Sequence, residues 1–247
     1  MLIDAHAHLT DDELFVLKDY IIMMINRLNI KVVSVSMDLI TSERNLELSS
    51  DAIIPFVGIH PWSINEDLER FEEFVIANID KIYGIGEIGL DKKYAKDGEE
   101  YERQKHIFRS MLDIAEKYDK SVSIHSRASL DDIFEILSSY NLRVLLHWFA
   151  GSKKQLRYAN EHGYYVSYGP ALLYASDKPH LLQESEKELI LIETDSPVHY
   201  PRCFEERMAM PSYLISVAYA VSNILGFDYC NTCNMLTNNT LRYLAIE

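Results

Sequence analysis

The sequence predicts an α/β protein with a single TIM-like (β/α)₈ barrel of parallel strands and a metal site at its C-terminal rim. Eight short apolar runs, each typical of a strand buried on both faces, alternate with segments of helical periodicity. Such alternation implies a parallel sheet, and eight βα units suit a closed barrel. The length of 247 residues is also close to the roughly 250 residues that are typical of this fold.

The predicted strands are bounded by polar or glycine-containing turns. They are Leu2–His6, Lys31–Ser36, Ala52–Val57, Ile82–Ile88, Ser121–His125, Arg143–His147, Tyr164–Ser167 and Leu189–Glu193. An open doubly wound sheet is the structural alternative. We favour the barrel because no glycine-rich phosphate loop follows the first strand.

Each strand is followed by helical material. The first helix is predicted over Leu14–Leu28, where leucine and isoleucine recur at helical spacing. The others are predicted around Ser42–Ser50, from about Asn65 to Ile79, at Glu99–Lys117, Leu130–Ser139 and Lys153–Glu161, as short helices near Pro170 and Pro179, and at Pro211–Leu225 and Tyr229–Leu244. No repeat, low-complexity tract or linker interrupts the order, so residues 1–247 are expected to form one domain.

Composition narrows the functional classes. The net charge of −14 argues against passive, non-specific binding to nucleic acid, but a nuclease is not excluded because bound cations offset local negative charge. No apolar run reaches the about 20 residues of a membrane span, and no signal-like segment opens the chain. Three cysteines do not make a disulfide framework. We therefore expect a cytoplasmic protein, a monomer without membrane contact.

Chemistry-bearing residues follow the predicted strands at equivalent places. In a (β/α)₈ barrel the C-terminal ends of the strands share one rim, where the chemistry is located. The residues at these ends are His6 and His8, His60, Glu87, His125, His147 and Asp195. Each alone has an ordinary alternative, such as a loop carboxylate, a hydrogen-bonded core histidine or a helix cap. Their coincidence on separate strands predicts a metal site.

The ligand types exceed what one tetrahedral zinc needs and predict two divalent ions, zinc, manganese or magnesium, about 3.5–4 Å apart. We assign His6, His8, Glu87 and Asp195 to one ion, and Glu87, His125 and His147 to the other. Glu87 is the expected bridge, and Asp195 the expected general base for a metal-activated water. Asp4 and Glu193 lie one layer deeper on the same faces, where they are expected to orient the ligands.

The chain resembles the TatD family of metal-dependent hydrolases, often called deoxyribonucleases, along its full length. The matching stretches include Ile3–His8, Gly58–Trp62, Gly86–Asp91, Gln104–Ala115, Ile124–Arg127, His147–Ser152, Ser167–Pro170, Glu193–Pro197 and Thr237–Leu241. The resemblance implies a TIM-like barrel, one or two divalent ions and hydrolysis of phosphodiesters, typically in DNA. It also places His60 at the position of a family active-site histidine.

Two stretches depart from the family pattern. Ala209-Met210-Pro211 replaces the usual Asn-Glu-Pro and follows Glu205 and Glu206, and His147-Trp148-Phe149-Ala150-Gly151 replaces the commoner His-Cys-Phe-Ser-Gly. These changes make the expected surroundings of the substrate more acidic. They leave a second hypothesis open, a hydrolase of the same fold acting on a small ester, lactone or amide. A third is a non-catalytic barrel in which the metal is structural.

Three further residues are candidates for substrate contact. Arg127 lies two residues beyond His125 and can hold a phosphate by paired hydrogen bonds, or pair with a nearby carboxylate. Trp62 and Trp148 directly follow rim histidines, where they can stack on an unpaired base or pack against the barrel.

Overall fold

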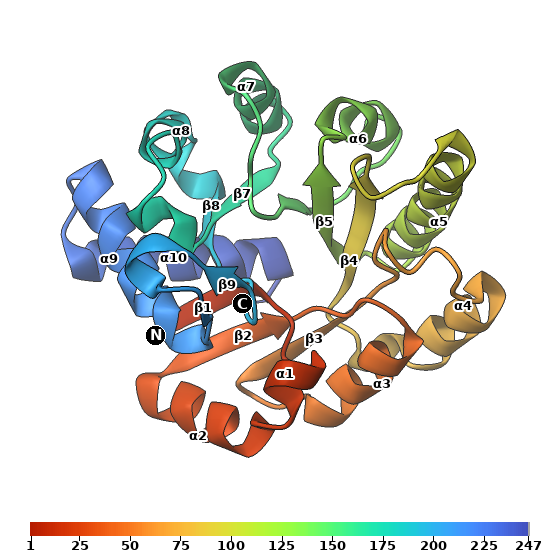
Figure 1. The fold of residues 1–247 in the computed structure, drawn as a ribbon, viewed down its shortest axis with the longest axis horizontal. Coiled ribbons are helices and arrows are strands. Elements are labelled where there is room, and N and C mark those ends of the chain that lie inside the picture. Colours follow the sequence, from red (N-terminus) through yellow and green to blue (C-terminus); the bar gives the residue numbers. More distant parts are fainter. Residues whose placement is uncertain (247) are drawn as a thin grey trace.

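Eight parallel strands form one sheet in the order β1 to β8, with helices arranged around it in Figure 1. The structure, a computed structural model, describes residues 1–246. The strands are β1 Leu2–Ala7, β2 Ile30–Ser34, β3 Ile53–Val57, β4 Gly84–Asp91, β5 Ser121–Arg127, β6 Val144–Leu146, β7 Tyr165–Tyr168 and β8 Ile190–Ile192. The predicted barrel, with strands and helices alternating in this order, is confirmed.

The helices lie close to the predicted segments. They are α1 Asp12–Phe15, α2 Lys18–Leu28, α3 Leu39–Leu48, α4 Leu68–Ala77, α5 Gly98–Lys117, α6 Leu130–Leu137, α7 Lys153–Glu161, α8 Lys178–Glu184, α9 Leu214–Leu225 and α10 Tyr229–Leu244. Short 3-10 helices occupy Ile79–Lys81, Pro170–Leu173, Lys187–Leu189, Arg202–Phe204 and Pro211–Tyr213.

The first predicted helix is wrong in one respect, because it is broken in two. Asp11 caps α1 by accepting a hydrogen bond from the Glu13 amide, and the helix ends at Phe15. Leu17, the residue before α2, has a non-helical backbone. The apolar spacing that predicted one helix included Leu17, but its side chain is exposed and does not pack with the buried Leu14, Ile21 and Ile25.

A two-stranded antiparallel hairpin, β9 His199–Tyr200 with β10 Arg207–Met208, lies outside the barrel and was not predicted. Strands of two residues carry no periodicity that the sequence could reveal. The hairpin follows β8 and precedes α9, so it extends the last loop of the C-terminal rim.

The barrel closes between β1 and the segment that follows β8. The His8 amide donates to the Ser196 carbonyl at 2.7 Å, and the Asp195 amide donates to the His6 carbonyl at 3.0 Å. These two bonds bring the first and the last of the predicted rim residues together. Strand interiors are buried throughout β1, β3, β4 and β8, as expected for a sheet covered by helices on its outer face.

Within residues 1–246, no helix combines the length and the apolar character that a membrane crossing requires.

Candidate metal centre

Glu87 is the centre of the predicted site. Its side chain projects from the middle of β4 and is buried, and five imidazole rings face its carboxylate. Its Oε1 lies 2.8 Å from His125 Nδ1, 2.8 Å from His147 Nε2 and 3.3 Å from His60 Nε2. Its Oε2 lies 3.1 Å from His8 Nε2 and 3.4 Å from His6 Nε2. Oε1 therefore faces rings that follow or end three different strands, whereas Oε2 faces the two histidines of β1 and its C-terminal end.

Asp195 completes the cluster from the other side. Its Oδ1 lies 3.5 Å from His8 Nε2 and 3.7 Å from His6 Nε2. The backbone of Asp195 is left-handed, with a φ of 48°, which aspartate tolerates better than most residues. Its side chain is buried and lines the mouth of the barrel.

Burial and mutual charge set the protonation of this cluster. Burial works to raise the pKa of Glu87, but the histidines around it, His60 and His147 first, hold that pKa well below its usual range. Burial works to lower the pKa of His8, yet its hydrogen bonds to Asp195 and Glu87 raise it to about 10. Burial lowers the pKa of His6 to about 4. Ionised carboxylates and a neutral imidazole thus meet in one buried place.

The donor set fits divalent metal ions. His6 Nε2 and His8 Nε2 face each other at 3.3 Å, and both also face Glu87 and Asp195. Neutral imidazole nitrogens and carboxylate oxygens that converge in this way are the ligands preferred by zinc, and acceptable to manganese. Three groups of residues bring ligand atoms within 4.8 Å of one another: His6, His8 and Glu87; His6, His147 and Asp195; and His60, Glu87 and His125.

The grouping differs from the expected partition at two positions, His147 and His60. His147 was expected beside His125, but its ring also stacks on His6, with centroids 3.8 Å apart. His60, which was expected as an active-site histidine and not as a ligand, lies 3.4 Å from His125 Nδ1 and within reach of Glu87. His60 therefore belongs to one of the groups whose ligand atoms lie close enough to share a metal ion.

Sequence reasoning missed two residues that orient the histidines. Ser123 Oγ lies 2.8 Å from His6 Nδ1, and Asp91 Oδ2 lies 3.1 Å from His125 Nε2. Each contact holds the ring nitrogen that points away from Glu87. Period-two spacing along β5 could have revealed Ser123, since it shares a face with His125. Asp91 follows Glu87 by four residues in β4, but no local pattern indicates its partner.

Glu193 is buried beside His147 but does not bond it, since its Oε1 lies 3.9 Å from His147 Nδ1. It accepts hydrogen bonds from the Trp148 amide at 2.8 Å and from Ser167 Oγ at 2.5 Å. Trp148 has a φ of 43°, which is strained for a bulky side chain and persists only where the surroundings enforce it. Glu193 therefore shapes the turn after β6, and through it the place of His147.

Asp4 has an equivalent place beneath Asp195. Its carboxylate accepts hydrogen bonds from the Thr194 amide at 2.9 Å and from Thr194 Oγ1 at 2.5 Å. Burial raises the pKa of Asp4 to about 8. Asp4 thus ties β1 to the residue that immediately precedes Asp195, which agrees with the deeper position expected from the sequence.

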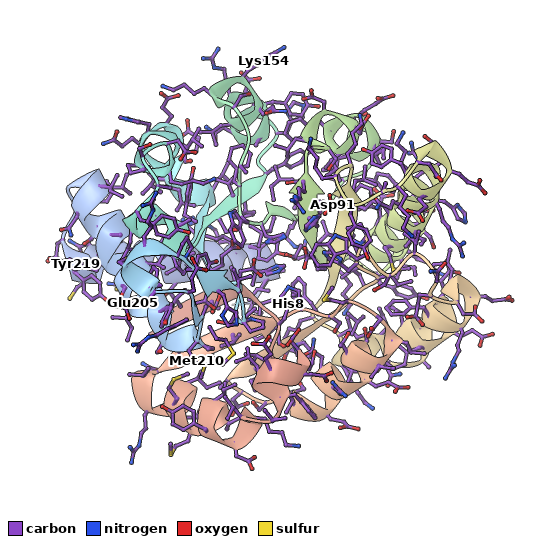
Figure 2. All side chains as sticks on the ribbon, in the orientation of Figure 1. His8, Asp91, Lys154, Glu205, Met210 and Tyr219 are labelled. Carbon is purple, nitrogen blue, oxygen red and sulfur yellow. The ribbon has the colours of Figure 1, made fainter. Side chains whose placement is uncertain are left out.

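A cavity of about 580 Å³ opens above the cluster. Arg127, Trp62 and Trp148, the three residues predicted to contact substrate, all line it. Figure 2 places His8 and Asp91 near the middle of the ring of elements, and Lys154 and Tyr219 at its outer edge. The cavity is therefore the mouth of the barrel at its C-terminal rim.

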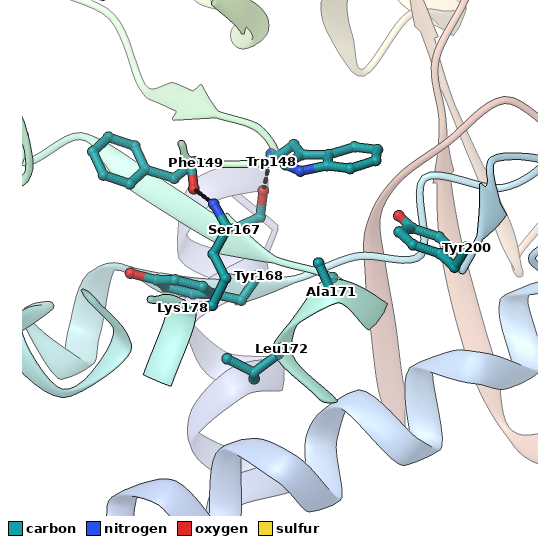
Figure 3. A pocket seen from close by; sticks show the side chains of 9 residues that line it. Trp148, Phe149, Ser167, Tyr168, Ala171, Leu172, Lys178 and Tyr200 are labelled. Carbon is teal, nitrogen blue, oxygen red and sulfur yellow. Dashed lines mark hydrogen bonds between the residues drawn. The ribbon is translucent and has the colours of Figure 1, made fainter. Parts of the chain in front are cut away.

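Behind Trp148 lies a much smaller, closed cavity of about 10 Å³, room for one water at most. Figure 3 shows Lys178 reaching across it to the backbone of Phe149, whose carbonyl accepts from Nζ at 2.6 Å. Trp148 stacks on Tyr200 at the edge of this cavity, with centroids 5.5 Å apart. These contacts pack the Trp148 ring against the rim on one side, while it lines the mouth on the other.

The acidic segment that departs from the family pattern lies away from the mouth. Glu205 and Glu206 belong to the turn of the β9–β10 hairpin, and neither lines the cavity. Ala209 is fully buried, and its amide donates to the Val198 carbonyl at 2.9 Å. The acidic residues expected near the substrate are thus not part of the cavity lining.

Comparison with known proteins gives one consistent result. The family model described as "TatD related DNase" matches residues 3–245. The metal-dependent hydrolase YabD of Bacillus subtilis is 28% identical over 259 aligned positions and is covered, like this chain, over 100% of its length. The human protein named deoxyribonuclease TATDN3 is 25% identical, with 98% of this chain and 93% of its own length covered.

Solved structures agree on the fold. The TatD homologue YjjV of Escherichia coli superposes with a TM-score of 0.91 at 23% identity, covering 100% of this chain and 98% of its own. A TatD family hydrolase of Entamoeba histolytica gives a TM-score of 0.85 at 20% identity. Both confirm the barrel. The family match over residues 3–245 establishes that this chain belongs to the TatD family of metal-dependent hydrolases.

Proposed function

We infer that this TatD-family hydrolase cleaves phosphodiester bonds in DNA with two divalent ions, zinc, manganese or magnesium, bound at the rim cluster. The observation that carries the proposal is the convergence of five imidazoles on the Glu87 carboxylate, with Asp195 opposite. Relatives named deoxyribonucleases supply the substrate class. We place the enzyme in the cytoplasm as a monomer, on the sequence expectations above.

One ion would be held by His6, His8, Glu87 and Asp195, and the other by Glu87, His125 and His147, with His60 close enough to share the second. When bound, such ions polarise the phosphoryl oxygen and lower the pKa of water toward neutrality. Asp195 accepts the proton of the attacking water, for which its burial at the mouth and its left-handed backbone position it. Glu87 keeps its negative charge between the two groups of ligands.

Arg127 contributes the substrate contact. Its side chain is 61% exposed at the cavity wall, and its closest carboxylate, Asp91, is 4.0 Å away and already bonded to His125 and Trp62. The guanidinium donors therefore remain available for a phosphate, which a planar fork binds with paired hydrogen bonds.

The test is cleavage of single-stranded DNA by metal-loaded protein. We expect cleavage by the wild type and a loss of about 100- to 10,000-fold in rate for Asp195→Asn, the range for removal of a general base. The Lys154→Ala variant, altered on the outer face, is the control and should match the wild type. DNA left intact by the wild type, or cleaved equally by Asp195→Asn, contradicts the proposal.

The small ester, lactone or amide hypothesis is the alternative, and it rests on the acidic balance of the chain and on Ala209-Met210 in place of Asn-Glu. Ala209 and Met210 do not line the mouth, and we therefore keep this hypothesis second. A structural role for the metal is tested by metal content. We expect His6→Ala protein to bind less metal and to lose activity while remaining folded. A His6→Ala protein that loses metal and unfolds, together with a wild type that cleaves no ester, would favour a structural ion.

A further inference from the structure

One wall of the mouth is built from the ends of three adjacent strands and carries an unusual pair of exposed aromatic rings. Trp62 follows β3, Tyr94 follows β4, and Arg127 ends β5. The rings of Trp62 and Tyr94 stack, with centroids 5.1 Å apart and an interplanar angle of 21°. Trp62 is 42% exposed and Tyr94 is 47% exposed. Contiguous exposed apolar surface next to a cavity is a feature of ligand-binding grooves.

The Trp62 ring is held in a fixed orientation. Its Nε1 donates to Asp91 Oδ2 at 2.8 Å, and the same oxygen faces His125 Nε2 at 3.1 Å. Asp91 Oδ1 accepts from the backbone amides of Lys93 and Tyr94, each at 3.0 Å, which fixes the loop that carries the second ring. A single carboxylate therefore sets the distance between the aromatic pair and the metal cluster.

The two rings do not face the cavity equally. Trp62 lines it, whereas Tyr94 is not among the lining residues and supports Trp62 from behind. The rings of His60 and His125 also meet Trp62 at steep angles of 85° and 70°, with centroids 4.8 Å and 6.2 Å away. What Tyr94 and the histidines leave uncovered is thus an apolar aromatic surface next to the reacting centre, with Arg127 beside it.

Resting on the proposed phosphodiesterase activity, we propose that Trp62, backed by Tyr94, is a stacking platform for one unpaired nucleobase of the strand being cleaved. Arg127 holds the phosphate that adjoins this base. An aromatic face accepts any base because every base has a π-face, so the platform selects for single-stranded or frayed DNA and not for sequence. Bases inside a duplex are covered on both faces by their neighbours and do not reach it.

The platform is tested by binding, separately from turnover. Metal-loaded protein is titrated with deoxyadenosine monophosphate and with deoxyribose phosphate, which differ only by the base. We expect the nucleotide to bind at least about tenfold more tightly in the wild type, within the range measured for a base stacked on an aromatic ring. The ratio of the two dissociation constants divides out any disturbance of the metal site, because both ligands carry the same phosphate.

Variants separate stacking from structure. In Trp62→Leu the ratio should fall to within about twofold of one, and in Tyr94→Ala to an intermediate value. Tyr94→Phe keeps the ring and should keep the ratio. Tyr219→Ala, which removes another exposed tyrosine, 60% exposed and at the outer edge, is the control and should leave the ratio unchanged. A ratio near one in the wild type, or an unchanged ratio in Trp62→Leu, overturns the platform.

A phosphodiester without a nucleobase distinguishes the two proposals. If methyl nitrophenyl phosphate and DNA are both hydrolysed while the binding ratio is near one, the platform is wrong and the proposed function stands. If neither is hydrolysed while the ratio is high and falls in Trp62→Leu, the proposed function is wrong and the platform is a nucleotide site of another reaction. If both proposals hold, the wild type should cleave an oligonucleotide that ends in an abasic residue more slowly than its normal counterpart. Trp62→Leu should cleave the abasic oligonucleotide at the same rate as the wild type does.

Discussion

A single hydroxyl group orients the His6 ring. Ser123 Oγ lies 2.8 Å from His6 Nδ1, and both groups are fully buried. Contacts of this kind fix the tautomer of a metal-binding imidazole and direct its other nitrogen at the ion. His6 Nε2 thereby faces Glu87 and Asp195, although the two carboxylates come from opposite sides of the barrel.

We therefore expect Ser123→Ala to weaken metal binding by about 10- to 100-fold, the usual effect of losing such a contact. Competition with a chelator of known affinity measures the change. Ser138→Ala, which removes an exposed hydroxyl at the end of α6, is the control. Equal metal affinity in both variants would show that Ser123 does not set the ring.

Asp4 makes stability depend on pH. Burial raises its pKa from the ordinary 3.8 to about 8, so between these values the folded protein keeps a proton that the unfolded chain releases. The contribution of Asp4 to folding stability is therefore fully present below about pH 3.8, where its carboxyl group is protonated in both states. It is lost as the pH rises toward and through the folded pKa of about 8. An asparagine resembles the protonated carboxyl group and does not titrate.

Asp4→Asn should therefore gain stability relative to the wild type between about pH 5 and about pH 8. Urea denaturation of both proteins at the two pH values, with chelator present, measures this difference. Asp51→Asn, a change at an exposed turn before β3, should show no such trend. If the stabilities of Asp4→Asn and the wild type change in parallel with pH, Asp4 does not titrate in this range.

At the scale of elements, the start of α3 connects local helix chemistry to the mouth. Asp38 Oδ1 accepts from the Thr41 amide at 2.8 Å, and Thr41 Oγ1 accepts from the Asp38 amide at 3.1 Å, which makes a reciprocal cap. Thr41 Oγ1 also accepts from the amide of Met37, which lines the cavity. This cap explains why α3 begins at Leu39, ahead of the Ser42 expected from apolar spacing.

Asp38→Ala should cost about 1 kcal/mol of unfolding free energy, within the 0.5–2 kcal/mol typical of a lost N-cap. Chemical denaturation gives the value, and Asp51→Ala, with no helix to cap, should change it by less than about 0.5 kcal/mol. If Asp38→Ala also lowers the free energy of unfolding by less than about 0.5 kcal/mol, the Thr41 hydroxyl alone stabilises the start of the helix.

At the scale of the whole molecule, the proposed metal ligands connect the first and the last strand of the barrel. They come from β1 and from the segment after β8, and from β4, β5 and the segment after β6. An ion bound to this set is bound to the folded chain only, since the unfolded chain separates the ligands. Metal affinity should therefore appear as folding stability.

Removal of metal with a chelator should lower the thermal midpoint, and re-addition should restore it. At free metal about 100 times the dissociation constant, the expected stabilisation is about 2.7 kcal/mol. His6→Ala should show a smaller dependence on added metal. Identical melting of the wild type with chelator and with metal would contradict binding at the cluster.

The order of the elements and the rim residues were predictable because both depend on local pattern. Buried strands are apolar runs, and the residue that ends each one lies on the rim whatever its neighbours are. The β9–β10 hairpin and the break before α2 at Leu17 were not predictable. Strands of two residues show no periodicity, and the break does not interrupt the apolar spacing.

The sequence by itself determined the barrel, through eight apolar runs that alternate with helical segments, and the family, through motifs that match along the whole chain. It also predicted six metal ligands from the residue types at the strand ends. The tertiary structure alone decided which groups touch: His60 beside His125, Ser123 behind His6, and Asp91 shared between His125 and Trp62. Contacts across a barrel join residues from different strands, and no sequence spacing records how far apart those strands place their side chains.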